Sequence, residues 1–420
     1  MDKQQIDHMV SDKAKAAKSG MRTLSLVSSE VRNNALQAMA SAIRDNRESI
    51  LAANKIDMKN GLADRLADPL MKRLELDDKK IEIMADNLVQ VAALPEPIGQ
   101  IDSMWERPNG LRIGTVRVPI GVIGVIYESR PNVTVEVAAL CIKSGNGVLL
   151  RGGSEAISSN TVIAEILQKS AKDFGLDQAI QFVNITDRQA VQSMIAKHEL
   201  IDLIVPRGSN EFIRYIMKNS EIPVVGHADG VCHVFIDQNA DLEMATEIAI
   251  NSKTQYVAAC NAMETLLVHQ KVAQDFLPRI QVRLAQEGVE LRGCKTSQSI
   301  CPDMLAANSE DWSAEYLDKI LSIRIVDDFD QAVDHINKYG SHHSDAIITK
   351  DYATAQKFLK VVDSAAVYVN SSTRFTDGYE FGLGAEVGIS TQKLHCRGPM
   401  GLEGLTSYKY VIYGDGQIRQ

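Results

Sequence analysis

The sequence predicts an α/β protein whose strands form parallel sheets, and three observations support this fold class. Short apolar runs alternate with helical stretches from residue 120 to about residue 206, and a second series of the same kind begins near residue 231. At roughly 150 residues per domain, the 420 residues suggest two to three domains. Strands that alternate with helices of this length imply βαβ units, which bind ligands at the carboxyl ends of their strands.

The N-terminal region, residues 1–95, is predicted to be helical. Its apolar residues recur near a 3.6-residue period in two stretches. Ser28 and Ser29 precede the first of these stretches and are suitable helix caps. Pro95 and Pro97 are expected to end the helical region.

Two further β elements are expected outside the alternating regions. Residues 101–119 carry the turn signal Pro108-Asn109-Gly110 between strand-like runs and are predicted to form a hairpin. The last forty residues are rich in glycine and end in the strand-like run YKYVIY. This tail suits an arm that packs on another subunit, and a solvated terminus is the alternative.

The two alternating regions supply the predicted strands of the parallel sheets. In the first region the runs are 121–128, 147–153, 179–185 and 200–206. In the second region they are 231–237, 264–270, 320–328, 344–350 and 364–370.

Composition and charge exclude several classes of protein. The formal net charge of −9 argues against non-specific binding of nucleic acid, which needs a basic face. No apolar run approaches the ~20 residues needed to cross a bilayer, and residues 1–20 lack the apolar centre of a secretory signal. Six cysteines without a CxxC pair are too sparse for a disulfide framework, so we expect reduced thiols in a cytoplasm.

Cys260 is the first candidate for chemistry. It lies between small residues in NSKTQYVAACNAMETLLVH, just before a predicted strand. A thiolate at a loop–strand junction can face a cleft together with its own backbone N–H, and covalent catalysis on acyl groups needs this pairing of nucleophile and oxyanion donor. The alternative is a small buried hydrophobe, which is the usual role of a free cysteine.

Two loops after predicted strands are candidates for binding a dinucleotide. Gly208 and Ser209 precede a helix whose N-terminus offers free N–H groups to a pyrophosphate, although an ordinary βα loop with a serine cap is the alternative. Arg151 ends another strand and is followed by Ser154, so its guanidinium suits an adenosine ribose or its 2′-phosphate. A surface arginine is the competing interpretation.

A metal site is not expected. His342 and His343 lie near Asp345, but no third ligand has suitable spacing in the sequence.

Several long strings together resemble one family. PIGVIGVIYESRPNVTVEVAALCIKSGNGVLLRGGSEAI is similar in layout to the core of the aldehyde dehydrogenase superfamily. CNAMETLLVH, VPRGSNEFIRYI, STRFTDG, EFGLGAEVGIS and RGPMGL resemble the gamma-glutamyl phosphate reductase family within it. The resemblance runs from about residue 20 to the C-terminus. It implies an aldehyde dehydrogenase-like fold with two Rossmann-like αβα domains, for the cofactor and for catalysis, plus a small β oligomerisation element.

The resemblance implies roles for particular residues. Cys260 becomes the nucleophile that attacks L-glutamyl 5-phosphate, and Asn132 is the nearest match to the side chain that holds the oxyanion. The resulting thioester would be reduced to glutamate 5-semialdehyde by NADPH. Glu315 matches the glutamate that contacts a nicotinamide ribose, with a helix-surface carboxylate as the alternative. The stretch NVTVEVAAL alternates like a strand but corresponds to a helix in this family.

One departure from the superfamily bears on the reaction. Aldehyde-oxidising relatives carry a glutamate in an ELGGK motif upstream of the cysteine, and Gly226 occupies that spacing here. A general base for thioester hydrolysis is therefore expected to be missing. An acyl phosphate reductase needs no activated water, because phosphate is the leaving group, so the departure favours the reductase over an oxidiser.

The resemblance also implies substrate contacts. Arg374 in STRFTDG suits a carboxylate or phosphate. Ser344 and Asp345 in HHSDAI are expected near the ammonium end of the substrate, and a structural role in a loop is the alternative for all three.

The predicted domains follow from the same resemblance. The cofactor domain comprises residues 1–100 and 120–228, the catalytic domain residues 229–394, and the oligomerisation elements residues 101–119 and 395–420. A homo-oligomer is expected. Two other functions remain open: another aldehyde dehydrogenase, oxidising or CoA-acylating, or a non-catalytic scaffold that holds a glutamate kinase.

Overall fold

The computed structural model describes residues 1–227 and 229–419. They form two compact units. The first unit contains residues 1–226, 382–388 and 399–420, and the second contains residues 227–381 and 389–398.

The sheet of the first unit has the strand order of a dinucleotide-binding half-domain. Its strands are β3 (Val122–Tyr127), β4 (Gly147–Gly152), β5 (Ile180–Phe182) and β6 (Leu203–Arg207). They run in the order β5-β4-β3-β6, and every neighbouring pair is parallel. The direction of chain progression reverses between β3 and β6, and ligands of open α/β sheets bind at such a switch point.

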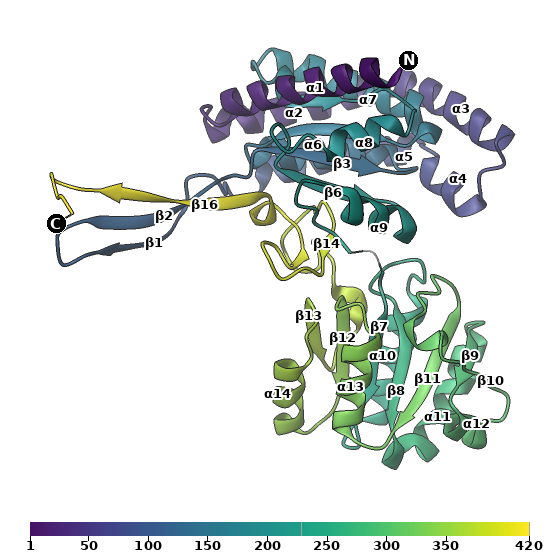
Figure 1. The fold of residues 1–420 in the computed structure, drawn as a ribbon. Helices are drawn as coiled ribbons and strands as arrows, with labels where there is room; N and C mark the ends of the chain where they lie inside the picture. The colour runs from purple at the N-terminus through teal and green to yellow at the C-terminus, as the bar shows by residue number, and fades with distance from the viewer. Residues whose placement is uncertain (228, 420) are drawn as a thin grey trace. The chain divides into compact units, whose positions relative to one another are not determined.

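Helices form before and between these strands (Figure 1). Ser28 caps the second helix by accepting a hydrogen bond from the backbone N of Val31, as predicted for this serine. The helices of the first unit are α1 (Lys3–Leu24), α2 (Ser29–Asp45), α3 (Arg47–Ala63), α4 (Asp68–Leu74), α5 (Asp78–Ala93), α6 (Pro131–Lys143), α7 (Ile157–Lys172), α8 (Gln189–Ile195) and α9 (Asn210–Asn219), with short 3-10 turns at Ser154–Ala156 and Asp177–Ala179.

Helix α6 explains why the sequence NVTVEVAAL looks like a strand. Nearly all of its residues are buried, because it packs against α2, α5 and α7 as well as against β4. A helix surrounded by other elements can be apolar on every face, so its apolar residues no longer follow the 3.6-residue period. The helix expected from the family resemblance is confirmed.

The second unit is built around a larger parallel sheet. Its strand order is β10-β9-β11-β8-β7-β12-β13, with all pairs parallel. The strands are β7 (Cys232–Ile236), β8 (Met263–His269), β9 (Glu290–Gly293), β10 (Leu305–Ala306), β11 (Ile320–Val326), β12 (Ser344–Ile348) and β13 (Ala366–Val369). The helices are α10 (Leu242–Thr254), α11 (Gln270–Gln286), α12 (Lys295–Ile300), α13 (Phe329–Tyr339) and α14 (Tyr352–Val361), with 3-10 turns at Asp311–Ser313 and Thr373–Phe375.

The α/β fold class with two Rossmann-like units is thus confirmed. The sequence predicted the long buried strands of both units, and it missed β9 and β10, which are short and partly exposed. Apolar side chains from the sheet and from α10 and α11 form the core of the second unit.

A three-stranded antiparallel sheet belongs to the first unit. The predicted hairpin supplies β1 (Ile101–Glu106) and β2 (Arg112–Pro119), and the C-terminal run supplies β16 (Thr406–Tyr413), which pairs with β2 (Figure 1). All of β1 and most of β16 are exposed. The remaining elements of the C-terminal region are the short strands β14 (Ile389–Ser390) and β15 (Gly398–Pro399) and a 3-10 turn at Glu403–Leu405.

Among the described residues, no helix combines the length and the apolar composition needed to cross a bilayer. All six cysteines are free thiols.

Candidate active site

A cavity of about 530 Å³ lies in the first unit, a volume typical of small-ligand sites. It contains three of the residues predicted to bind a dinucleotide, Arg151, Ser154 and Ser209. Its other lining residues are Glu128, Gly153, Glu155, Thr186, Arg188, Val191, Gln192, Glu211, Phe212 and Tyr215.

Arg151 brings a buried positive charge to this cavity. It is the last residue but one of β4, and its Nη2 donates a hydrogen bond to the carbonyl oxygen of Thr186 at 3.0 Å. Its Nε is buried and has no hydrogen-bonding partner among the described residues. Burial lowers the pKa of the Arg151 guanidinium, and Glu155 and Glu128 counteract this shift, so the group remains a cation. The unpartnered Nε–H donor and the positive charge of Arg151 both suit an anionic ligand.

The N-terminus of α9 is partly occupied by a carboxylate. The backbone N of Ser209 donates to Glu128 Oε2 at 2.9 Å, and a side chain at Gly208 would collide with the same carboxylate. Glu128 follows β3 and Ser209 follows β6, so this contact lies at the switch point of the sheet. The pyrophosphate site predicted at Gly208 and Ser209 therefore stays a prediction, in which a phosphate would compete with Glu128 for the amide.

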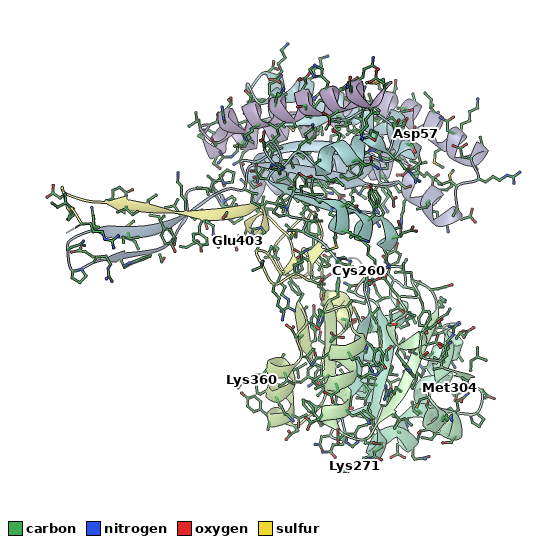
Figure 2. All side chains as sticks on the ribbon, in the orientation of Figure 1. Asp57, Cys260, Lys271, Met304, Lys360 and Glu403 are labelled. Atoms are coloured by element: carbon green, nitrogen blue, oxygen red, sulfur yellow. The ribbon has the colours of Figure 1, made fainter. Side chains whose placement is uncertain are left out.

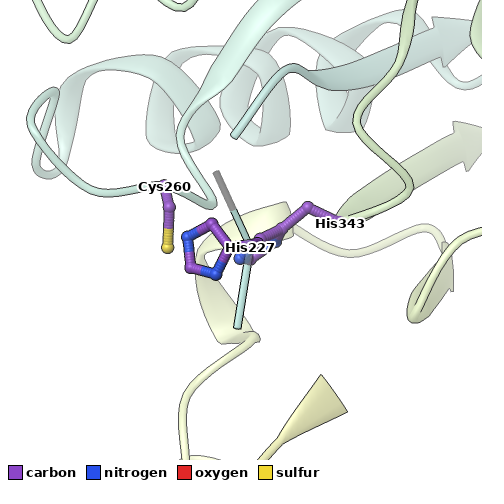
Figure 3. A group of neighbouring side chains, drawn as sticks. All are labelled: His227, Cys260 and His343. Carbon is purple, nitrogen blue, oxygen red and sulfur yellow. The ribbon is translucent and has the colours of Figure 1, made fainter. Parts of the chain in front are cut away.

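Cys260 lies in the second unit, on the half-buried loop between α10 and β8 (Figure 2). Two imidazoles accompany it, from His227 and His343, and one ligand atom of each of the three side chains lies within 4.8 Å of the others. Figure 3 shows the sulfur of Cys260 directed toward the ring of His227, with His343 on the other side of that ring. The two rings meet edge to face, with centroids 4.7 Å apart. We refer to these three residues as the Cys260 cluster.

The hydrogen bonds of His227 determine which of its nitrogens faces the cluster. Nδ1 lies 2.8 Å from the carbonyl oxygen of Ile389, which can only accept, so Nδ1 carries the hydrogen. In the neutral ring Nε2 then holds a lone pair. Nε2 is therefore the nitrogen that would accept the proton of the Cys260 thiol.

A clamp of hydrogen bonds places Arg374 near Cys260. The side chain of Asn261 donates to the carbonyl oxygens of Arg374 and Thr376 at 3.3 and 2.9 Å, and Thr373 Oγ1 donates to the carbonyl oxygen of Asn261 at 2.7 Å. Burial lowers the pKa of the Arg374 guanidinium, and the neighbouring Cys260 opposes this shift. The predicted anion-binding arginine and the predicted nucleophile therefore lie within electrostatic range of each other.

Glu315 is tied to the same loop through Gly230. The backbone N of Gly230 donates to Glu315 Oε1 at 2.9 Å, and a Cβ at Gly230 would collide with the backbone of Cys260. Glu315 lies in an irregular segment before β11, so the alternative of a helix-surface carboxylate is wrong. The structure places this predicted ribose contact close to Cys260.

A buried ion pair anchors the segment that carries Glu315. Lys253 Nζ and Glu264 Oε2 are 2.6 Å apart with both side chains fully buried, and the backbone N of Leu317 donates to Glu264 Oε1. Burial raises the pKa of Glu264 to about 7, an effect that Lys253 opposes. Such a pair is costly to break on one side only, so it holds Leu317 and the segment beside it firmly.

Ser344 and Asp345 lie inside the second unit rather than on its surface. Both are fully buried. Ser344 Oγ contacts His343 Nδ1 and Thr376 Oγ1, and Asp345 accepts from the backbone N of His233. Each side chain thus has a structural use, and contact with the substrate ammonium stays a prediction.

Asn132 belongs to the first unit, where it follows Pro131 at the start of α6. Its Nδ2 donates to Glu136 Oε1 at 2.9 Å, one helical turn away. The oxyanion role expected of Asn132 stays a prediction.

Sequence reasoning missed several residues of the two sites, among them Arg188 in the cavity and His227 and His343 beside Cys260. A signal for His227 was present, because it directly follows Gly226, the position at which aldehyde oxidisers carry their glutamate. The structure places two imidazoles beside Cys260. The expectation that a general base for thioester hydrolysis is missing stays a prediction.

Comparisons with known proteins show the family of this chain. The sequence model of the aldehyde dehydrogenase family matches residues 1–291. Gamma-glutamyl phosphate reductases of Caldanaerobacter subterraneus subsp. tengcongensis and Thermodesulfovibrio yellowstonii are 52% and 50% identical, over 97% and 99% of this chain and 99% and 100% of theirs. The chain belongs to the aldehyde dehydrogenase family, among its gamma-glutamyl phosphate reductases.

Solved structures place the fold in the same family. The crystal structure of gamma-glutamyl phosphate reductase from Thermotoga maritima is 44% identical, with a TM-score of 0.97 over 98% of this chain and 100% of that chain. An acetylating aldehyde dehydrogenase from Geobacillus thermoglucosidasius shares the fold at 16% identity, with a TM-score of 0.67 over 100% of this chain and 99% of that chain.

Proposed function

We propose that the protein reduces L-glutamyl 5-phosphate to L-glutamate 5-semialdehyde and phosphate with NADPH, the second step of proline biosynthesis from glutamate. The observation that carries this proposal is the half-buried Cys260 with the imidazole of His227 beside it and the Arg374 cation within electrostatic range. The names of the full-length relatives supply the substrate.

The first chemical step forms a thioester on Cys260. His227 Nε2 accepts the thiol proton, and the thiolate attacks the acyl carbonyl carbon. The backbone N–H of Cys260 and the side chain of Asn132 would hold the oxyanion, and the Arg374 guanidinium would bind the phosphate or carboxylate. The carbon–oxygen bond to phosphate then breaks, and the leaving phosphate oxygen takes the proton from His227.

The second step releases the aldehyde. When bound, the nicotinamide supplies the hydride that reduces the thioester carbon. Cys260 then acts as the leaving group, because the carbon–sulfur bond breaks as the carbonyl forms again. The sulfur departs as a thiolate and takes one proton from solvent before the next cycle. His227 lies near this sulfur, and its imidazole would stabilise the thiolate once the ring has taken up a proton from solvent.

We also propose that the cavity of the first unit binds the adenosine half of the cofactor and that NADPH is preferred over NADH. Arg151 and Arg188 both line it and would hold a 2′-phosphate, and Ser154 offers a hydroxyl. Gly208 and Ser209 would approach the pyrophosphate. Glu315, which lies beside the cysteine loop, would contact the nicotinamide ribose.

A pair of cysteine variants tests the proposed function. Cys260→Ser is expected to lower NADPH oxidation coupled to a glutamate kinase by roughly 10³-fold or more, because a hydroxyl lacks the acidity and nucleophilicity of the thiol. Cys294→Ser is the matched control, since Cys294 is a half-buried thiol outside the cluster, and it should keep near-normal activity. Near-normal turnover of Cys260→Ser would refute the mechanism.

The reverse reaction separates the reductase from its rivals. Glutamate semialdehyde and NADP should give NADPH only when phosphate is present, because phosphate must cleave the thioester. Phosphate-independent activity would indicate an oxidiser, and CoA dependence an acylating enzyme. The absence of any catalytic activity, together with binding of a glutamate kinase, would indicate a non-catalytic scaffold for that kinase. Association with such a kinase is otherwise only a prediction.

We further propose that the three-stranded sheet mediates a homo-oligomer. Large side chains are exposed on it, among them Trp105, Tyr408, Tyr410 and Ile412, and the rings of Trp105 and Tyr410 contact each other edge to face. A cluster of exposed aromatic residues on an antiparallel sheet is typical of an interface. Light scattering should give the mass of a dimer or tetramer, and Tyr410→Lys should lower it. A monomeric mass for the unmodified protein would remove this proposal.

A further inference from the structure

We propose that the Cys260 cluster binds a Zn²⁺ ion reversibly, and that the bound ion blocks catalysis. Binding itself depends only on the arrangement of the three side chains. The inhibitory consequence rests on the proposed function, because the ion would occupy the sulfur and the lone pair that the reaction uses.

The three ligand types suit zinc, and their spacing is close to a zinc site. A thiolate and two imidazoles are common zinc ligands, with bonds of roughly 2.3 Å to sulfur and 2.0–2.1 Å to nitrogen. In a tetrahedron these bonds place neighbouring ligand atoms roughly 3.3–3.6 Å apart. The ligand atoms of His227, Cys260 and His343 lie within 4.8 Å of one another. Side-chain shifts of about 1 Å would close the site.

Both histidines use Nδ1 in their hydrogen bonds, so Nε2 of each ring is the atom that would bind a metal ion. His227 uses Nδ1 on the carbonyl oxygen of Ile389, which leaves Nε2 as the ligand atom. His343 uses Nδ1 on Ser344 Oγ at 2.8 Å, and its Nε2 is buried and has no hydrogen-bonding partner among the described residues. A fully buried imidazole nitrogen without a partner is costly, and a metal ion would satisfy it.

Contacts behind His343 are of the kind that orients a metal ligand. Ser344 Oγ, which contacts His343 Nδ1, also lies 2.6 Å from Thr376 Oγ1, which in turn lies 2.7 Å from the hydroxyl of Tyr368. This chain of hydroxyl groups fixes the ring plane of His343. Metal-bound histidines usually engage their second nitrogen in this way, which sets the tautomer.

Opposing electrostatic effects predict moderate affinity. The helices α10 and α13 end shortly before Cys260 and His343, at Thr254 and Tyr339, and the C-terminal end of a helix favours a cation. The positive charge of the Arg374 guanidinium near Cys260 disfavours a bound cation. Three protein ligands leave the fourth position of the ion to water, as in catalytic zinc sites. The ion is therefore expected to be removable by a chelator.

Zinc competition with a chromophoric chelator tests binding on the purified full-length protein. The unmodified protein should bind one equivalent of Zn²⁺. Cys260→Ser should weaken binding by roughly 100-fold and His343→Gln by roughly 10-fold, since each removes one ligand. His342→Asn is the matched control: His342 adjoins the cluster, is not part of it, and has φ of +60°, which asparagine tolerates. The affinity of the His342→Asn variant for Zn²⁺ should equal that of the unmodified protein.

A second measurement locates the ion and separates the two proposals. Zn²⁺ should protect Cys260 from alkylation by iodoacetamide, read out by mass spectrometry, and should inhibit NADPH oxidation until a chelator is added. Equal zinc affinity in Cys260→Ser, or unprotected alkylation of Cys260 in the presence of Zn²⁺, would overturn the inference. If Cys260→Ser loses zinc but keeps its activity, the metal site stands and the proposed function fails.

Discussion

The two αβ units carry their sites at opposite edges of similar parallel sheets. In the first unit the cavity residues Glu128 and Ser209 follow strands β3 and β6, at the carboxyl edge. In the second unit Cys260 precedes β8 and His343 precedes β12, at the amino edge. The first unit obeys the rule for open α/β sheets, and the second does not.

This difference follows from the direction of the helices. Each helix that follows a strand begins at the carboxyl edge, where its free N–H groups favour phosphates and other anions. Each such helix ends at the amino edge, where free carbonyl groups favour cations. The first edge thus suits an anionic cofactor, whereas the second suits imidazolium, guanidinium or a metal ion, and its chemistry must come from side chains.

The two sites also differ in how firmly their residues are held. Gly230, Asn261 and Glu264 connect the cysteine loop to its neighbours through close packing and buried hydrogen bonds. The cavity of the first unit is lined largely by exposed or half-buried side chains on loops and on helices α8 and α9. Substitutions should therefore affect turnover in the second unit and cofactor affinity in the first.

The largest effect is expected for Gly230→Ala. Its Cβ would collide with the backbone of Cys260, so the nucleophile must move. Misplacement by about 1 Å can cost roughly 100-fold in turnover, so kcat should fall by at least that factor. Cofactor binding, measured by NADPH fluorescence, should change little. Gly226→Ala is the control, because its Cβ would have no neighbour closer than 3.8 Å. Equal kcat values for both variants would contradict the close packing of Gly230 on Cys260.

A smaller effect is expected for Asn261→Ala, which releases the turn that carries Arg374. The loss of a buried hydrogen bond on each carbonyl should lower kcat/KM for the acyl phosphate by roughly 10- to 100-fold. The KM for NADPH should stay within about twofold in steady-state assays. A change confined to the KM for NADPH would show that the clamp serves the cofactor instead.

Arg188→Ala tests the first unit, where a substitution should change cofactor affinity rather than turnover. If Arg188 binds a 2′-phosphate, its removal should raise the KM for NADPH about 10-fold and leave kcat and the KM for NADH nearly unchanged. Arg214→Ala serves as the control, because Arg214 is exposed on α9 outside the cavity lining. Equal loss with NADPH and NADH would assign Arg188 to another part of the cofactor.

The smallest effect is on stability, and it concerns the second unit. Burial lowers the pKa of His335 from 6.5 to about 2. The unfolded chain therefore binds a proton below pH 6.5 that the folded chain does not, so stability is lost as the pH falls from about 6.5 toward 2. One histidine contributes a slope of up to roughly 1.4 kcal/mol per pH unit.

Denaturant unfolding at several pH values measures this slope. His335→Phe keeps a ring beside Trp312 and Tyr339 and should flatten the acid loss, even if it is less stable at neutral pH. An unchanged slope would show that other groups cause the acid sensitivity.

Local patterns in the sequence accounted for most of the elements and made Cys260 a candidate nucleophile, a role that the family resemblance then favoured. Buried strands are recognisable in the sequence as short apolar runs. Cys260 was singled out because it lies among small residues just before such a run. The family resemblance was needed for α6, since a helix buried on all sides loses its periodicity. It was also needed for Glu315, which lies in an irregular segment without any local pattern.

The Cys260 cluster could be seen only once the chain had folded. His343 meets Cys260 because β12 pairs with β7 and β7 pairs with β8, in a register that aligns Asp345 with His233 and His233 with Thr265. No periodicity in the sequence encodes such a register. Apolar periodicity records which face of a segment is buried, whereas the pairing of distant segments depends on how whole surfaces pack. The sequence, through its apolar patterns and its family resemblance, therefore predicted the fold and the candidate sulfur of Cys260. Only the packing of the folded chain determined which imidazoles lie beside that sulfur.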